Sequence, residues 1–410
     1  MREAMKRAFT PLRHGLFRAM WIASVVSNVG TWMHTVAASW LMTLLATSPL
    51  PVALVQTATT LPVFLITLPA GAIADLIDRR RWLIFTQSLM LAVAAAIGVL
   101  TLMGRIGPWS LLLLTFGLGI GSSLNQPAWS ATIPELVPRE ELPAAVALNS
   151  VGFNIARAIG PALGGMVMAA SNAGVVFIMN AISFLAVIVV LCFWNGSARR
   201  IASAPLREAI REGLHYVRST RVYHAVLVRA GLFAFAASAL WALLPVVASS
   251  ELGTTETGYG ILLGCLGVGS VVGAASLGAL RARYSPDLLI FCGVVAFALV
   301  TVALATIHSF AWLAAAMVVG GVAWMTVMTT FNVTAQSAPP AELRARALAV
   351  YILVFQGALA IGSAAWGSIA GRWHVNTALL AAAVAIAAGL ITGTKLKLES
   401  TALEDTEYVA

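Results

Sequence analysis

Charged side chains are scarce in this chain: Asp, Glu, Lys and Arg make up 10% of the 410 residues, whereas apolar residues make up 60%. Soluble globular domains carry about 25% charged residues, so the composition excludes that class. None of these four residue types occurs between Ala19 and Ala74, a run long enough for two membrane helices and too long for the core of a signal peptide. The chain is therefore predicted to be a polytopic membrane protein.

Cysteines and catalytic groups are also few. Cys192, Cys265 and Cys292 all lie in apolar stretches without paired spacing, which argues against disulfides and metal sites. No HExxH motif, phosphate-binding glycine loop or intramembrane Ser–His pair occurs, so neither an enzyme nor a cofactor is predicted. The formal net charge is +9, but the basic residues are dispersed among short loops, which argues against a nucleic-acid partner.

The apolar runs are separated by Pro, Gly and charged residues, for example at 48–51, where prolines end one helix and start the next. These breaks predict an all-α membrane protein with twelve transmembrane helices. We expect a six-helix bundle over residues 1–195 and another over 223–395. Apolar residues spaced by four, four and three positions predict an amphipathic cytoplasmic helix at 196–222, with a solvated linker as the alternative. Residues 396–410 form a polar cytoplasmic tail.

Internal repetition supports two related halves. One set of four residues recurs 207 positions later, a Gly-Ala-aliphatic triplet recurs at the same offset, and an Ala-Ile-Gly triplet recurs at 202. The repeated residues are Asn125, Ala128, Ser130 and Ala131 with Asn332, Ala335, Ser337 and Ala338; residues 71–73 with 278–280; and residues 158–160 with 360–362.

The distribution of basic residues predicts orientation. With both termini cytoplasmic, only Arg105 and Arg372 fall outside, and Arg157 and Arg229 lie within spans. The positive-inside rule therefore places the chain in the inner, or plasma, membrane with both termini inside.

A charged connection, LPAGAIADLIDRRRWL, lies between the second and third spans (68–83). Its residues Gly71, Asp75, Arg79 and Arg80 resemble the loop signature of the major facilitator superfamily, although Leu76 and Asp78 depart from it. The resemblance implies two six-helix repeats and a cytoplasmic latch in which Asp75 lies against the start of the eleventh helix. The alternative is a solvated hairpin whose arginines only hold it on the cytoplasmic side.

The fifth span contains Gly160, Pro161, Gly164 and Gly165, which resemble the helix-five motif of superfamily exporters, with Ala156 in place of its leading glycine. Glycines allow close helix approach and Pro161 can hinge the helix; ordinary small-residue packing is the alternative.

The segments SNVGTWMHTVAASWLM (27–42) and PAWSATIPELVPREELPAAVALNS (127–150) resemble the branch with the enterobactin exporter and macrolide efflux proteins. That resemblance implies proton-driven export of a small organic molecule.

Polar residues recur at helical spacing within three spans and predict a substrate cavity, because such stripes cannot face lipid cheaply. Hydrogen bonding between helices is the alternative for any single Asn or Gln. Arg157 stands about fifteen residues into its helix, and no acidic residue lies inside a span to offset its charge. The cavity candidates are Asn28, Trp32, Thr35, Asn154, Arg157, Asn332 and Gln336.

Membrane-embedded carboxylates are missing, and the fourth span lacks the arginine that many superfamily antiporters carry there. Within the spans, His34 is the group whose unperturbed pKa lies near physiological pH, so it is the candidate proton carrier. A structural histidine, a role for Asp75 or Asp78, and uncoupled facilitation are the alternatives.

We therefore expect a monomeric secondary transporter that exports a small, amphiphilic, drug- or siderophore-like molecule by proton antiport, with the lipid bilayer as its other partner. Uptake of a metabolite on the same fold, coupled or uncoupled, is the main alternative. A non-transporting membrane receptor would need no polar stripes. The substrate cannot be named from sequence, since specificity depends on cavity shape and a few polar contacts.

Overall fold

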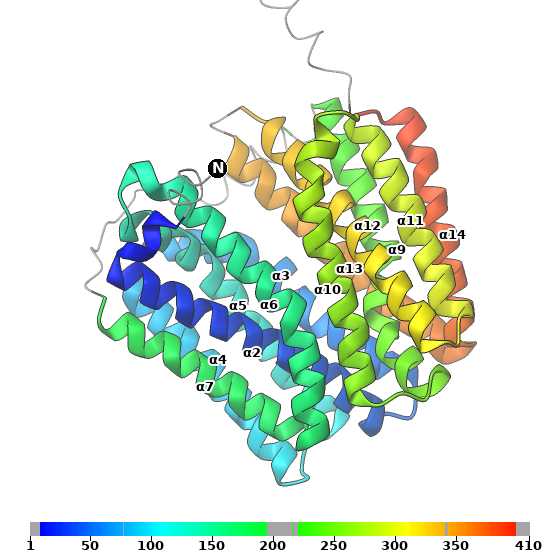
Figure 1. Cartoon of the computed structure of the whole chain (residues 1–410), viewed down its shortest axis with the longest axis horizontal. Helices are drawn as coiled ribbons and strands as arrows, with labels where there is room; N and C mark the ends of the chain where they lie inside the picture. Colours follow the sequence, from blue (N-terminus) through cyan, green and yellow to red (C-terminus); the bar gives the residue numbers. More distant parts are fainter. Residues whose placement is uncertain (1–8, 77, 195–215, 217–219, 341–342, 399–410) are drawn as a thin grey trace, which may run out of the picture. The chain divides into compact units, whose positions relative to one another are not determined.

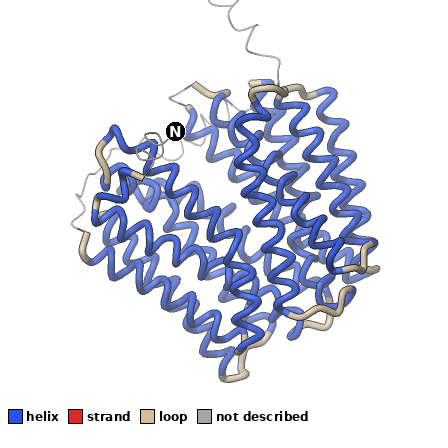
Figure 2. Tube along the Cα trace, in the orientation of Figure 1, coloured by secondary structure: helices blue, strands red, loops and turns tan. Residues whose placement is uncertain are grey.

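The computed structural model describes residues 9–76, 78–194, 216, 220–340 and 343–398, and for residues 67–76 and 345 it describes the backbone alone (Figure 1). In these segments helices are joined by short loops, and no strand occurs (Figure 2). Most of the predicted linker helix and most of the predicted tail lie outside the described residues.

The helices group into two compact units, of which unit 1 comprises Met1–Leu45, Leu65–Ser203 and Thr255–Gly264. Its helices are α2 (Gly15–Leu45), α4 (Arg79–Leu102), α5 (Pro108–Leu136), α6 (Leu142–Ala170) and α7 (Ala173–Cys192), with 3₁₀ turns at Thr10–Arg13 and Arg139–Glu141.

Unit 2 comprises Ala46–Phe64, Ala204–Thr254 and Cys265–Ala410. Its helices are α9 (Arg221–Val246, continued by a π turn at Val247–Glu251), α11 (Pro286–Thr306), α12 (Phe310–Ser337), α13 (Arg344–Arg372) and α14 (Val375–Lys395). Two further helices are divided between the units: α3 (Pro49–Leu76) and α10 (Glu256–Arg281).

The described residues thus form twelve α-helices of twenty or more residues. Ten helical segments are long and apolar enough to cross a membrane. Helices α2 and α5 are not among the ten, because polar residues such as Asn28 and Asn125 interrupt their apolar runs. The break expected at 48–51 lies slightly earlier, at residues 46–48, because α2 ends at Leu45 and Pro49 already starts α3.

Helix starts repeat along with the sequence. Asp78 caps α4 by accepting a hydrogen bond at Oδ1 from Arg81 N (3.0 Å). Ser285, 207 positions later, caps α11 by accepting at Oγ from Leu288 N (3.3 Å). Both side chains satisfy a backbone donor that the first helical turn leaves unpaired. The offset found in the sequence therefore also relates the helix boundaries.

The first part of α10 packs inside unit 1. A Cβ added to Gly260 would lie 2.7 Å from the Pro161 carbonyl oxygen, so the backbones of α10 and α6 touch. Trp40 stacks on Tyr259 with ring centroids 5.8 Å apart. Glycine is required at this approach because any larger residue would separate the helices.

The first part of α3 packs in the same manner inside unit 2. Thr57 Oγ1 donates to the Ala360 carbonyl on α13 at 3.0 Å. A Cβ on Gly357 would lie 2.7 Å from Phe64 Cδ2. Since α3 and α10 are related by the 207-residue offset, each half of the sequence contributes the start of one equivalent helix to the other unit.

Candidate functional site

Two glycines bring the predicted polar face of α6 against α2 in unit 1. A Cβ on Gly160 would lie 2.6 Å from Trp32 Cβ, and one on Gly164 would lie 2.9 Å from Met33 Cα. Gly165 faces α10 instead, where its added Cβ would lie 2.7 Å from the Glu256 carbonyl oxygen. The predicted close-packing glycines thus allow α6 to approach two neighbouring helices, α2 and α10. Helix α6 continues without a break through Pro161. A hinge at this proline remains a prediction.

This close packing places Arg157 beside an aromatic face. Its guanidinium carbon lies 5.7 Å from the centroid of the Trp32 ring, a cation–π geometry. Phe153 meets Trp32 edge-on, with centroids 6.3 Å apart at 63°. Arg157 is fifteen residues past Leu142, about 22 Å along α6. A cation and two aromatic rings therefore meet deep along the bundle.

The neighbouring predicted residues bond within their own helices. Asn28 Nδ2 donates to Ser24 Oγ at 3.3 Å, and Thr35 Oγ1 donates to the Thr31 carbonyl at 3.0 Å. On α6, Asn154 Nδ2 donates to the Ser150 carbonyl at 2.9 Å. These bonds each connect a residue to the preceding turn, so none of them joins two helices.

Asn332 and Gln336 lie on α12 in unit 2, where Gln336 Nε2 donates to Asn332 Oδ1. Asn332 is half-buried and Gln336 is exposed. The predicted cavity residues therefore form two sets, one in each unit.

His34 faces a different neighbour from Trp32. Two positions along α2 correspond to about 200° of rotation, and the imidazole packs against Phe177 of α7 with centroids 4.6 Å apart. The side chain is 2% exposed, and neither ring nitrogen has a hydrogen-bond partner among the described residues. Asn180, also on α7 and fully buried, likewise has no partner for its Nδ2 within the described part of the chain. His34 is thus enclosed within unit 1 away from Arg157.

The arginines of the charged connection make contacts inside unit 1. Arg79 Nη1 pairs with Glu135 and donates to the Ala131 carbonyl at 3.3 Å, both on α5. Arg80 donates from Nε to the Leu191 carbonyl at 2.9 Å and from Nη2 to the Cys192 carbonyl at 2.7 Å. These bonds tie the start of α4 to the ends of α5 and α7. The other two predicted latch residues, Gly71 and Asp75, lie outside the residues whose side chains are described, so the latch remains a prediction.

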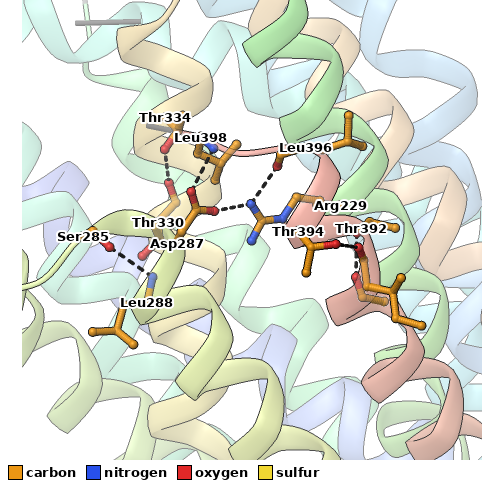
Figure 3. A network of polar contacts seen from close by, with 12 residues as sticks. Arg229, Ser285, Asp287, Leu288, Thr330, Thr334, Thr392, Thr394, Leu396 and Leu398 are labelled. Atoms are coloured by element: carbon orange, nitrogen blue, oxygen red, sulfur yellow. Dashed lines mark hydrogen bonds and ion pairs between the residues drawn. The ribbon is translucent and has the colours of Figure 1, made fainter. Parts of the chain in front are cut away.

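Unit 2 contains an ion pair that sequence reasoning missed. Arg229 on α9 pairs through Nη1 with Asp287 Oδ1 on α11, and the same nitrogen donates to the Leu396 carbonyl at 3.1 Å (Figure 3). Asp287 Oδ2 accepts from Leu398 N at 3.0 Å. The segment after α14 is therefore bound to the third turn of α9 and to the start of α11.

The 207-residue offset relates the Asp287–Leu398 contact to a contact in unit 1. It relates Arg80 to Asp287 and Leu191 to Leu398. In unit 1, Arg80 at the start of α4 bonds to the backbone of Leu191 near the end of α7. In unit 2, Asp287 at the start of α11 bonds to the backbone of Leu398 just after α14. The chemistry differs, since Arg80 donates to a carbonyl whereas Asp287 accepts from an amide. The connection between the same two helix ends is kept.

A family model described as transmembrane secretion effector matches residues 6–409. The chain belongs to this family. It is a transporter of the major facilitator superfamily, a multi-pass membrane protein and not an enzyme. The resemblance seen in the sequence motifs is confirmed.

Similar curated proteins include an MFS-type transporter, YfiS, of Bacillus subtilis, with 26% identity over 90% of each chain. The multidrug efflux pump Tap of Mycolicibacterium fortuitum is 25% identical over 91% of this chain and 93% of its own length. The enterobactin exporter EntS of Shigella boydii is 26% identical over 67% of this chain and 66% of its own.

Among solved structures, a bacterial homologue of the human lysosomal transporter Spinster superposes with a TM-score of 0.75. The match covers 94% of this chain and 97% of that one at 13% identity, so it shows the shared fold alone.

Proposed function

We propose that this transporter exports a small organic, amphiphilic molecule of the drug or siderophore class across the plasma membrane. In the proposed arrangement twelve helices span the membrane, both termini are cytoplasmic, and proton entry drives export through alternating access. Support comes from the relatives, which include an efflux pump and an enterobactin exporter. Further support comes from the basic residues, which concentrate in the connections assigned to the cytoplasm.

The observation that carries the proposal is the position of Arg157 over Trp32 with Phe153 alongside. A guanidinium offers planar donors for carboxylate or phenolate oxygens, and indole offers a flat apolar face. Together they suit a ligand that combines an aromatic body with an electron-rich or anionic group. Burying an arginine near the bilayer centre costs roughly 2.5–3.5 kcal/mol. A bound anionic or electron-rich ligand would offset part of this cost, which favours its recognition.

Alternating access is supported by the two divided helices. Helix α3 passes from unit 2 to unit 1 after Phe64, and α10 passes from unit 1 to unit 2 after Gly264. We infer that rocking of the units bends these helices at those positions, because each end is packed in a different unit. Proton coupling is assigned to His34, with Asp75 and Asp78 as alternatives.

The test measures transport in proteoliposomes after a thermal-stabilisation screen of siderophores, macrolides and other amphiphiles has identified a ligand. Trp32→Ala removes the flat apolar face and the cation–π partner of Arg157 and should therefore weaken ligand binding, whereas Trp32→Phe keeps an aromatic face and should retain part of it. Arg157→Gln should reduce binding at least as much as Trp32→Ala. The control is Arg105→Gln, which changes an exposed arginine in the α4–α5 loop.

Equal binding and transport by Arg157→Gln, Trp32→Ala and the wild type would contradict the assignment. Accumulation of substrate on the cytoplasmic side under a physiological proton gradient would instead establish uptake.

A further inference from the structure

A groove opens between α10, α11 and α12 of unit 2. Its volume is about 310 Å³, and apolar side chains line nearly all of it. The lining includes Leu280 and Tyr284 near the end of α10, Leu289, Cys292 and Ala296 along α11, and Ala323 on α12. Three of the lining residues are exposed: Leu288, Cys292 and Val319. The groove is therefore open to the surroundings of the helices.

Large aromatic residues occupy the equivalent positions in unit 1. The 207-residue offset relates Leu289, Cys292, Ala296 and Ala323 to Trp82, Phe85, Leu89 and Phe116. Trp82 lies against Phe85 with centroids 5.6 Å apart, and its Nε1 donates to the Leu124 carbonyl at 3.1 Å. Three of the four replacements in unit 2 remove an aromatic ring. The groove therefore reflects smaller side chains in unit 2 rather than a feature common to both repeats.

Two arginines lie next in sequence to lining residues of the groove, Arg281 after Leu280 and Arg283 before Tyr284. Arg281 ends α10 and is half-buried, and Arg283 is exposed. Neither forms an ion pair with any residue that the structure describes. The corresponding positions in unit 1 hold Ala74 and Leu76. The open space is thus particular to unit 2, and so are arginines at these two positions, whereas unit 1 carries its basic residues at 79–81, equivalent to 286–288.

The carboxylate in the first turn of α11 does not neutralise these arginines. Asp287 is directed toward Arg229, and its second oxygen accepts from Leu398 N (Figure 3). Ser285 is engaged in capping α11 through Leu288 N. Arg281 and Arg283 are therefore available to an external anion at the end of an apolar groove.

We propose that this groove binds an anionic phospholipid. One acyl chain lies along α11 from Leu288 to Ala296, about 12 Å, and the phosphate lies at Arg281 and Arg283. The chain is a multi-pass membrane protein, so an apolar groove on its surface meets acyl chains, and paired basic groups select anionic headgroups. In the proposed topology this end of α10 is cytoplasmic.

The first experiment counts retained lipids by native mass spectrometry of the full chain in detergent, titrated with dioleoyl phosphatidylglycerol or dioleoyl phosphatidylcholine. The wild type should retain phosphatidylglycerol preferentially. Arg281→Gln with Arg283→Gln should weaken this binding roughly thirtyfold, since each basic group contributes about a factor of five. A matched double variant, Arg105→Gln with Arg372→Gln, removes two exposed arginines elsewhere and should bind as the wild type does.

Filling the groove tests the acyl-chain part. Cys292→Phe with Ala323→Phe installs the residues of unit 1 and should abolish retention of this lipid although both arginines remain. Ala296→Leu, which installs the smaller Leu89 equivalent, is the milder variant if the aromatic pair fails to fold. Undiminished phosphatidylglycerol retention by a folded filled variant would overturn the proposal. Equal retention of phosphatidylcholine by the wild type would overturn the role of the arginines.

A second readout uses the thiol in the groove. With Cys192→Ser and Cys265→Ser, maleimide labelling of Cys292 should slow severalfold in nanodiscs containing phosphatidylglycerol compared with phosphatidylcholine nanodiscs. The control places the thiol at the equivalent exposed position of unit 1, by Phe85→Cys with Cys292→Ser, where the two lipids should give equal rates. Equal labelling of Cys292 in both lipids would count against occupancy of the groove.

Discussion

Breaking the Arg229–Asp287 pair should destabilise unit 2 substantially. The arginine side chain is 7% exposed and the aspartate 23%. Removing one partner of a buried pair costs about 3–5 kcal/mol, and partial exposure of the aspartate reduces this to roughly 2–4 kcal/mol. Asp287→Asn also replaces the charged acceptor of Leu398 N, and Arg229→Met removes the donor to the Leu396 carbonyl. Each single variant should therefore release the segment after α14 as well.

A double-mutant cycle measures the coupling. Unfolding of the wild type, Arg229→Met, Asp287→Asn and the double variant should be followed in detergent micelles. The double variant should be much less destabilised than the sum of the single variants, with a coupling of at least about 1 kcal/mol, because no charge is left buried and unpaired. Additive losses, or single variants as stable as the wild type, would refute this reasoning.

Two further predictions compare matched variants. Gly165→Ala should lower the unfolding temperature, because its Cβ would lie 2.7 Å from the Glu256 carbonyl oxygen, whereas Gly389→Ala, with nothing within 4 Å, should leave stability unchanged or raise it by up to about 1 kcal/mol. Equal effects would show that α6 and α10 are not tightly packed. Arg80→Gln should cost about 2 kcal/mol through two lost carbonyl bonds, and the exposed Arg81→Gln less than about 0.5 kcal/mol. Similar denaturation midpoints for these two variants would exclude the role given to Arg80.

Local rules explain which parts of the fold could be predicted. Proline at the start of α3 and an Asx cap at Asp78 fix helix boundaries through backbone chemistry that neighbouring residues reveal. The division of α3 and α10 between the units could not be predicted. No change in sequence pattern marks the point where each helix passes between units, and packing partners such as Gly165 and Gly260 are far apart in the chain.

The candidate site shows the same limit. Helical spacing correctly put Trp32 and His34 on α2 but could not indicate that one faces α6 and the other α7. Arg229 was recognised as a charge within a span, yet its partner is 58 residues away at a helix start, where an aspartate is unremarkable by itself. Periodicity gives the face of a helix, whereas the neighbour of that face depends on tertiary packing.

Proton-coupled export is the central claim, and proton movement tests it most directly. Proteoliposomes containing the full chain, a pH-sensitive dye inside and a ligand found by thermal stabilisation should show ligand-dependent proton flux opposite to substrate flux. His34→Gln should abolish the proton flux while ligand binding, which we propose to involve Arg157 on another face, persists. Proton flux in His34→Gln equal to that of the wild type would remove the histidine from the mechanism. Substrate flux in the wild type without any proton movement would contradict antiport itself.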